Sequence, residues 1–161
     1  MRANNLNNTD QNVKEITEYY KRLLNGSTKV DESEYYINLG AVCCGSGDFE
    51  LAITYFKYFL KINEENIDKA GELKCYQGLG VAYYGLGDFE KAIENYLEAE
   101  KSFAEIGQKD DLKILYENMV RTYEKMNDSK KAEEYKRKVE KIKIDKIEEE
   151  GVSGKGPGVT M

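Results

Sequence analysis

The feature that most constrains the fold is an internal repeat with a period of 40 residues. The segment YINLGAVCCGSGDFELAITYF, which begins at Tyr36, recurs as YQGLGVAYYGLGDFEKAIENY from Tyr76 and in weaker form as YENMVRTYEKMNDSKKAEEYK from Tyr116. The matching columns hold Tyr36, Tyr76 and Tyr116, then Leu39, Leu79 and Met119, then Asp48, Asp88 and Asp128, and finally Ala52, Ala92 and Ala132. A fixed period of this length indicates a repeat protein, whose units bury their apolar faces by stacking on one another.

Each copy is expected to form two helices joined by a tight turn. The joint contains Gly47, Gly87 or Asn127, and these residue types tolerate the left-handed backbone that ends a helix. The aspartate that follows in each copy can cap the next helix, because its side-chain oxygen accepts from the free N–H groups of the first turn. The stop and start signals of the two helices therefore lie side by side.

In the first helix of the second copy, apolar residues recur at helical spacing on one face. That face also carries Gly80, where a neighbouring backbone could come close. We expect Ala92 to meet this gap from the partner helix.

The second copy resembles the tetratricopeptide repeat, whose pattern W-x2-L-G-x2-Y followed by A-x3-F is met by Tyr76, Leu79, Gly80, Tyr83, Ala92 and Tyr96. The first copy has Cys43 in the place of the second aromatic residue, and the third has Val120 for the glycine and Lys136 for the late aromatic. The resemblance covers about residues 33–143, with a period of 40 in place of the usual 34, as in the extended repeats of kinesin light chains. It implies an all-α, right-handed superhelical solenoid of three helix-turn-helix repeats with an N-terminal extra helix, and the longer period implies helices longer than average.

The domain is expected to span residues 10–149, with a capping helix at 10–25 and repeats at about 33–65, 66–108 and 109–149. Its last helix carries an apolar stripe in a heavily charged surround, which suits a terminal cap whose outer face meets water. The stripe consists of Ala132, Tyr135, Val139 and Ile142. Residues 1–9 and the Gly-rich tail 150–161 are expected to be disordered.

Composition and charge argue against several classes of function. The net charge is −6 and basic residues alternate with acidic ones, so we expect no nucleic-acid partner. No apolar run approaches the length of a transmembrane helix and no secretory signal precedes the repeats, so we expect a cytoplasmic protein without membrane insertion. The chain contains no histidine, which removes the commonest general base and zinc ligand, and we expect no enzymatic activity.

The three cysteines do not indicate a catalytic, metal or cofactor site. Cys43 falls on the face expected to pack against the second helix of its copy, which predicts burial. Cys44 falls one residue further round, toward the expected binding surface, so a redox or ligand-contact role stays open for it. With Cys75 they lack both C-x2-C spacing and a fourth soft ligand, so we predict neither a metal nor a cofactor.

The resemblance also implies where a partner binds, because the first helices of successive tetratricopeptide repeats line a concave groove. The corresponding positions are Ile37, Ala41 and Cys44, then Gln77, Val81 and Tyr84, and then Glu117, Arg121 and Glu124. Each triplet is spaced i, i+4, i+7 and so lies on one stripe of a helix. We expect a peptide with an apolar anchor near Tyr84 and polar residues near Arg121, either extended or helical.

The sequence therefore predicts a scaffold or adaptor that binds a segment of another protein in this groove. A regulator that responds to a small ligand or a signalling peptide is one alternative, and a structural unit that self-associates through its ends is another. Partner identity does not follow from a repeat fold that serves many processes.

Overall fold

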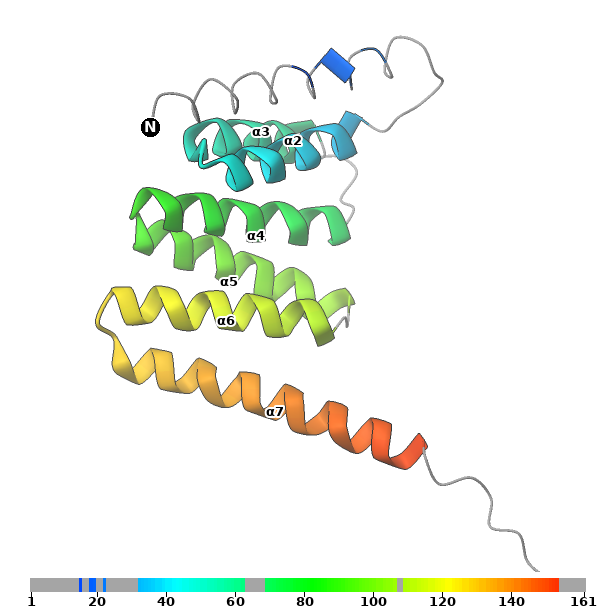
Figure 1. The fold of residues 1–161 in the computed structure, drawn as a ribbon, viewed down its shortest axis with the longest axis vertical. Helices are drawn as coiled ribbons and strands as arrows, with labels where there is room; N and C mark the ends of the chain where they lie inside the picture. Colours follow the sequence, from blue (N-terminus) through cyan, green and yellow to red (C-terminus); the bar gives the residue numbers. More distant parts are fainter. Residues whose placement is uncertain are drawn as a thin grey trace, which may run out of the picture. The chain divides into compact units, whose positions relative to one another are not determined.

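The computed structural model describes residues 32–62, 69–106 and 109–153, together with Glu15, Glu18, Tyr19 and Arg22. All regular secondary structure in these ranges is helical (Figure 1). The helices are α2 (Glu32–Ser46), α3 (Phe49–Ile62), α4 (Lys69–Leu86), α5 (Phe89–Ile106), α6 (Lys109–Lys125) and α7 (Ser129–Ser153). The predicted all-α fold of helical hairpins is confirmed.

The expected terminal segments fall largely outside the described residues. Residues 1–9 and 154–161 lie wholly outside them. Of the expected capping helix, only Glu15, Glu18, Tyr19 and Arg22 are described, and all four are helical. At the other end, α7 continues to Ser153, past the expected boundary at residue 149. It includes Gly151, since one glycine costs about 1 kcal/mol relative to alanine and does not by itself stop a helix.

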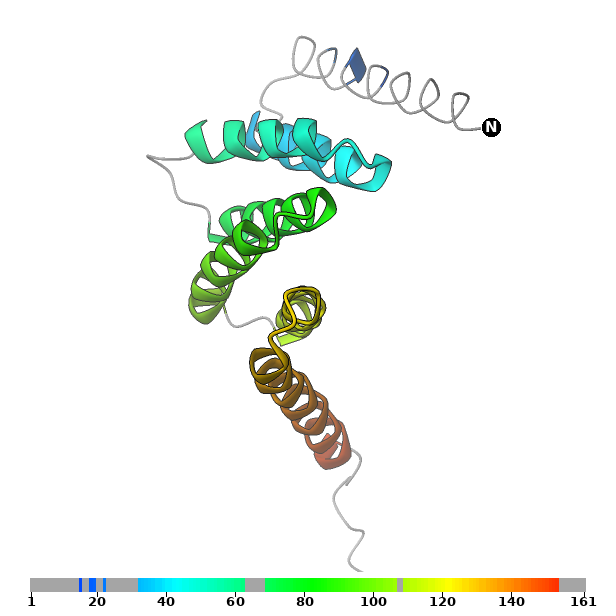
Figure 2. The same cartoon turned by 90° about the vertical axis from the view of Figure 1, so that its left-hand side faces the viewer.

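The helices belong to two compact units, with α2 to α5 in Met1–Gly107 and α6 and α7 in Gln108–Met161. Each copy of the repeat forms one hairpin, so that α2 pairs with α3, α4 with α5, and α6 with α7 (Figure 2). These helices contain 14 to 25 residues. The prediction of long helices is confirmed, since the mean in globular proteins is about 11–12 residues.

All three hairpins turn through the same backbone motif. In the first, the N–H of Gly47 donates to the carbonyl of Cys44 at 3.2 Å, and the N–H of Asp48 donates to the carbonyl of Cys43 at 2.9 Å. These two bonds define a Schellman ending, and they recur in the other two turns. The left-handed residues are Gly47, Gly87 and Asn127, with φ of 85°, 79° and 58°.

The aspartate after each left-handed residue also begins the next helix. The Asp88 Oδ1 accepts from the Lys91 N–H at 3.2 Å, and the Asp128 Oδ1 accepts from the Lys131 N–H at 3.0 Å. The Lys91 side chain, whose Nζ lies 2.6 Å from the Asp88 Oδ2, lowers the pKa of that carboxyl group by donating to it. The predicted caps at Asp88 and Asp128 are confirmed.

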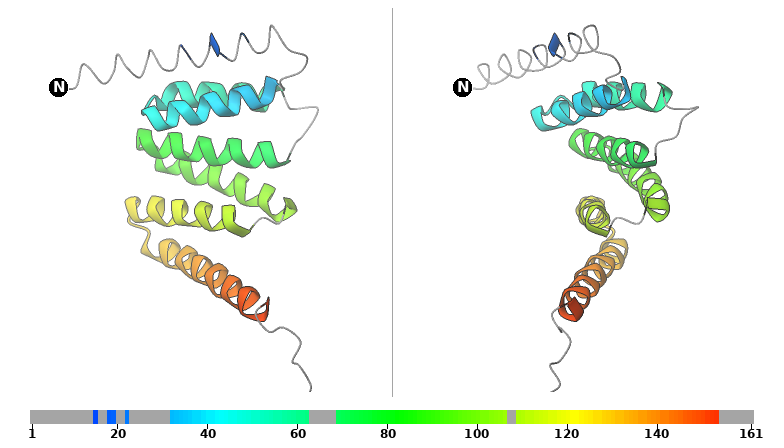
Figure 3. Two further views of the ribbon diagram at one scale, coloured as in Figure 1. Left: turned by 45° about the vertical axis from the view of Figure 1, so that its right-hand side comes forward. Right: turned by 90° about the vertical axis from the view of Figure 1, so that its right-hand side faces the viewer.

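A phenylalanine ring joins three helices of the first unit. Phe56 on α3 is 2% exposed and lies between α2 and α4, where a β-carbon on either Gly40 or Gly78 would overlap its ring. Figure 3 shows α2 and α3 beside α4 within this unit. The two glycines let the backbones of α2 and α4 approach the ring closely. The core cluster around it comprises Cys43, Ala52, Phe56, Phe59, Cys75, Leu79 and Ala82.

In the second hairpin, the space above Gly80 is filled by a ring. The atoms nearest to a β-carbon built on Gly80 belong to Tyr96, which is 2% exposed. The atoms nearest to this position therefore come from Tyr96 and not from Ala92, which was predicted to meet the gap. Ala92 is fully buried, but a methyl group is shorter than the tyrosine ring that projects from one turn further along α5.

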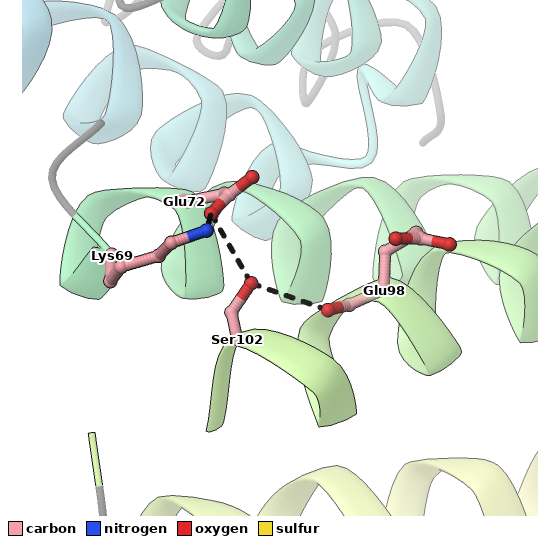
Figure 4. Close-up of polar contacts among 4 residues, drawn as sticks. All are labelled: Lys69, Glu72, Glu98 and Ser102. Atoms are coloured by element: carbon pink, nitrogen blue, oxygen red, sulfur yellow. Dashed lines mark hydrogen bonds and ion pairs between the residues drawn. The ribbon is translucent and has the colours of Figure 1, made fainter. Parts of the chain in front are cut away.

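A buried hydroxyl links α4 to α5 at the other end of this hairpin. The Ser102 hydroxyl donates to the Glu98 carbonyl at 3.3 Å and lies 3.4 Å from the Glu72 Oε2 (Figure 4). The Lys69 Nζ lies 2.8 Å from that same carboxylate oxygen. The buried hydroxyl therefore has a backbone acceptor, which removes the cost of burying an unpaired polar group.

The second unit has its own core of packed aromatic rings. Tyr135 on α7 lies 5.4 Å from the ring of Tyr116 and 5.6 Å from the ring of Tyr123, both on α6, as measured between centroids. The Lys138 ammonium lies 4.2 Å from the Tyr135 centroid, a cation–π contact. Of the predicted apolar stripe, Ala132, Tyr135 and Val139 are buried and Ile142 is half-buried.

Candidate functional site

The first three predicted binding residues lie on α2 and differ in exposure. Ala41 is exposed, whereas Ile37 and Cys44 are half-buried and pack against the core cluster around Phe56. Only Ala41 therefore presents most of its side chain to solvent. The other two form the edge where the surface of α2 meets the interior.

The next three lie on α4. Val81 is 36% exposed, and Gln77 and Tyr84 are half-buried. The Tyr84 ring lies 5.5 Å from the ring of Phe89 on α5, so part of its area is used in packing across the turn. The exposed aliphatic surface of α4 at this stripe is centred on Val81.

The structure brings the α2 and α4 stripes together. The two helices are in contact, and the Cys44 thiol lies 3.8 Å from the carbonyl oxygen of Gly78. Gly78 sits between Gln77 and Val81 in the sequence, so its contact with the Cys44 thiol lies at the level of the predicted surface. Six of the nine predicted residues thus lie on adjacent helices of one unit.

The remaining three lie on α6, in the second unit, and their polar groups have partners there. The Glu117 carboxylate lies 3.7 Å from the Lys113 ammonium, and the Arg121 Nε donates to the Glu117 carbonyl at 3.4 Å. The Glu124 carboxylate lies 2.7 Å from the Lys136 ammonium on α7. These exposed pairs contribute little to stability, since such ion pairs are worth about 0–1 kcal/mol.

The thiols are held in the protonated form. Burial raises the pKa of Cys43 and of Cys44 to about 11, with smaller contributions from Asp48 and from Cys43 respectively. Burial also raises the pKa of Cys75, whose Sγ lies 3.2 Å from the Phe56 carbonyl oxygen. The predicted burial of Cys43 is confirmed. Since the thiolate is the reactive form, none of the three is activated as a nucleophile.

The described residues contain neither a candidate metal site nor a candidate membrane span. In these ranges, no three or more cysteine and acidic side chains are grouped so that they could hold a metal ion. Among the described helices, none has both the length and the hydropathy that crossing a bilayer requires.

Sequence reasoning missed a groove between α6 and α7. It is open, has a volume of about 750 Å³, and includes Glu117 and Arg121 from the predicted set together with side chains of α7. Lys136 lies in it, at the position that Phe56 and Tyr96 occupy in the earlier copies. The replacement of an aromatic residue by lysine at this repeat position could have indicated the groove. It was not recognised because the rest of the α7 sequence is also rich in charged residues.

Comparisons with known proteins agree with this architecture. The model of the tetratricopeptide repeat family matches residues 31–105 and 75–145. The TPR domain of Arabidopsis FLU superimposes with a TM-score of 0.64 and 20% identity, covering 73% of this chain and 95% of that one. BtubC (BKLC) from P. vanneervenii gives a TM-score of 0.51 and 16% identity, covering 97% of this chain and 80% of that one.

At these identities the two structures establish the likeness of fold alone. No curated protein sequence matches the chain. The family model, by contrast, covers most of the chain and includes all three copies of the repeat. The chain therefore belongs to the tetratricopeptide repeat family.

Proposed function

We propose that the chain is a protein-interaction adaptor that holds a peptide segment or a helix of a partner on the surface formed by α2 and α4. Tetratricopeptide repeats are protein-interaction modules, and the family membership supports this general function. The observation that carries the specific proposal is the pair of exposed aliphatic side chains, Ala41 and Val81, on two adjacent helices.

The residues around this pair suit a peptide. Ile37, Cys44 and Tyr84 are half-buried, so their positions are fixed by packing and a ligand would meet a preformed surface. The Gln77 amide can both donate to and accept from a peptide backbone. Small aliphatic contacts beside one such amide favour a partner with an apolar anchor near Tyr84.

The α6 triplet is a polar surface of the second unit. Glu117, Arg121 and Glu124 present charges of both signs there, which suit polar residues of a partner. In this proposal the chain acts by binding alone and catalyses no reaction.

The test compares the double variant Val81→Asp/Tyr84→Ala with Leu97→Asp in affinity capture from the source lysate. Leu97 on α5 is 37% exposed against 36% for Val81, so Leu97→Asp introduces the same charge at equal exposure on a different helix. We expect the double variant to lose the captured partner and Leu97→Asp to retain it, with unchanged helicity by circular dichroism. If the double variant retains the partner, the surface of α2 and α4 is not the binding site.

A further inference from the structure

The groove on the second unit corresponds to a face that carries a helix in the first. In the first hairpin, Gly40 and Phe56 belong to the face on which α4 packs, with Gly78 of α4 against the Phe56 ring. Two repeat periods further along the chain, the equivalent positions hold Val120 and Lys136. Both residues line the groove between α6 and α7. The repeat register thus indicates a helix as the occupant of this groove.

The groove has an aliphatic floor. Val120 and Val139 are 9% and 6% exposed, and Ile144 beside them is 54% exposed. A large aliphatic side chain left this exposed would bury more apolar area when a helix covers it, at a gain of about 25 cal/mol per Å². The floor alone would accept any apolar helix face, so the selectivity must come from the rim.

The rim is predominantly basic. Its cationic residues are Arg121, Lys136, Arg137, Lys141 and Lys143, against three glutamates. Glu133 and Glu140 are paired with Arg137 and Lys143, at 3.6 Å and 2.8 Å. In the described part of the chain, neither Arg121 nor Lys141 has a carboxylate within ion-pair distance. A chain of net charge −6 thus carries a locally basic groove.

We propose that this groove binds an acidic amphipathic helix of another protein, seated as α4 is seated on the first hairpin. Its apolar face would cover Val120, Val139 and Ile144. Its carboxylates would face Arg121 and Lys141, which have no carboxylate within ion-pair distance among the described residues. This surface is separate from the one on α2 and α4.

Charge argues against the other occupants. Two copies meeting through the same groove would bring two net basic rims together, which is repulsive. The first 31 residues contain five basic and four acidic residues, so their sequence supplies no net negative charge to complement this groove. A nucleic acid would satisfy the cations but would leave the aliphatic floor without an apolar partner.

The test uses the full chain and a fluorescein-labelled, alanine-rich helical peptide of 18 residues, the length of α4. One face of the peptide carries leucines flanked by glutamates, and a second peptide has lysine in place of every glutamate. Fluorescence anisotropy then compares the chain with Lys141→Glu, with Ile144→Asp and with the control Lys130→Glu, which makes the same charge change on α7 outside the groove.

We expect the acidic peptide to bind, each groove variant to weaken binding at least tenfold, and Lys130→Glu to change it less than threefold. The lysine peptide should not bind. The proposal is overturned if the chain does not bind the acidic peptide, if it binds both peptides equally, if a DNA duplex competes through the same residues, or if light scattering detects a dimer that Ile144→Asp dissociates. The variants Val81→Asp and Tyr84→Ala should leave peptide binding unchanged, so failure of the proposed function is distinguishable from failure of this proposal.

Discussion

The ring of Phe56 on α3 lies directly against Gly78 on α4, so closely that a β-carbon on residue 78 would overlap it. A β-carbon on Gly40 of α2 would also lie 2.6 Å from the ring. The ring therefore packs closely against the backbones of both helices. This arrangement ties the first hairpin to the first helix of the second.

The substitution Gly78→Ala tests this packing. Because the buried ring packs closely against both helices, we expect the added methyl group to lower the free energy of unfolding by roughly 1–3 kcal/mol, the usual cost of overpacking a core. Urea denaturation followed by circular dichroism measures the change. The helical preference of alanine over glycine, about 1 kcal/mol, acts in the opposite direction. The observed loss of stability is therefore a lower bound on the packing cost of the methyl group.

The matched control for this substitution is Gly45→Ala. Gly45 lies in α2 as Gly78 lies in α4, but a β-carbon on it would meet no atom within 4 Å. We expect this variant to be more stable than the unmodified chain by about 0.5–1 kcal/mol, since alanine loses less backbone entropy. Equal effects at the two positions would mean that the Phe56 ring does not pack closely against both helices.

Substitutions at the left-handed residue of two equivalent turns should change stability in opposite directions. Gly87 has φ of 79°, and Gly87→Ala should cost about 1–2 kcal/mol because a β-carbon is unfavourable in the left-handed region. Asn127 already carries this cost in part, so Asn127→Gly should raise the melting temperature. Differential scanning calorimetry checks both. A lower melting temperature for Asn127→Gly would show that the asparagine side chain contributes more than its backbone conformation costs.

The sequence was sufficient to predict the hairpins, because their signals are local. The left-handed residue and the aspartate after it fix where each helix ends and the next begins, and Gly87 and Asp88 are an example. The contact of Tyr96 with Gly80 was not predictable in this way. Helical spacing identifies the face on which a glycine lies, but not which of two side chains on the partner helix reaches it.

The sequence predicted which residues of the candidate binding site share one face of a helix, but not how the helices pair. Spacing places Ala41 and Val81 on their helices, and the structure shows that these two helices are in contact. The groove that holds Lys136 and Ile144 was not predicted, because charged residues at helical spacing are usually a solvated face. Only the three-dimensional pairing of α6 with α7 brings its aliphatic floor and its basic rim into one surface.

The thiol pKa values predict a loss of stability at alkaline pH. Below the ordinary cysteine pKa, about 8.5, both the folded and the unfolded chain hold the thiol protons. Above it the unfolded chain ionises first, because the pKa values of Cys43 and Cys44 are raised to about 11 in the folded state. The free energy of unfolding should then fall by up to about 1.4 kcal/mol per pH unit for each thiol until the folded-state pKa is reached.

Urea denaturation at intervals from pH 7 to pH 11 measures this fall. The variant Cys44→Ala removes one of the ionising groups, so its stability should decrease less steeply over the same range. Iodoacetamide at pH 8 should alkylate the folded chain far more slowly than the urea-unfolded chain. An unchanged pH dependence in Cys44→Ala would contradict the assignment of this effect to the thiols.

The third hairpin replaces a glycine and an aromatic ring by Val120 and Lys136, and this pairing predicts a non-additive result. In the earlier copies the ring occupies the space left by glycine, as Tyr96 does above Gly80. Val120→Gly alone should destabilise the second unit, because it removes a buried side chain and adds a helical glycine. Lys136→Tyr alone gives a ring that meets the Val120 side chain and has no space in which to pack.

The double variant Val120→Gly/Lys136→Tyr should therefore be more stable than the sum of its single changes predicts, by about 1 kcal/mol, because the ring can then lie on the glycine. Urea denaturation of the four proteins measures this coupling energy. Additive effects within about 0.5 kcal/mol would mean that the two positions do not share one space, and the register that relates the α6–α7 groove to the face beneath α4 would then be wrong. If the two changes are coupled in this way, the tyrosine introduced by Lys136→Tyr occupies part of the groove. The same double variant should then no longer bind the acidic helix.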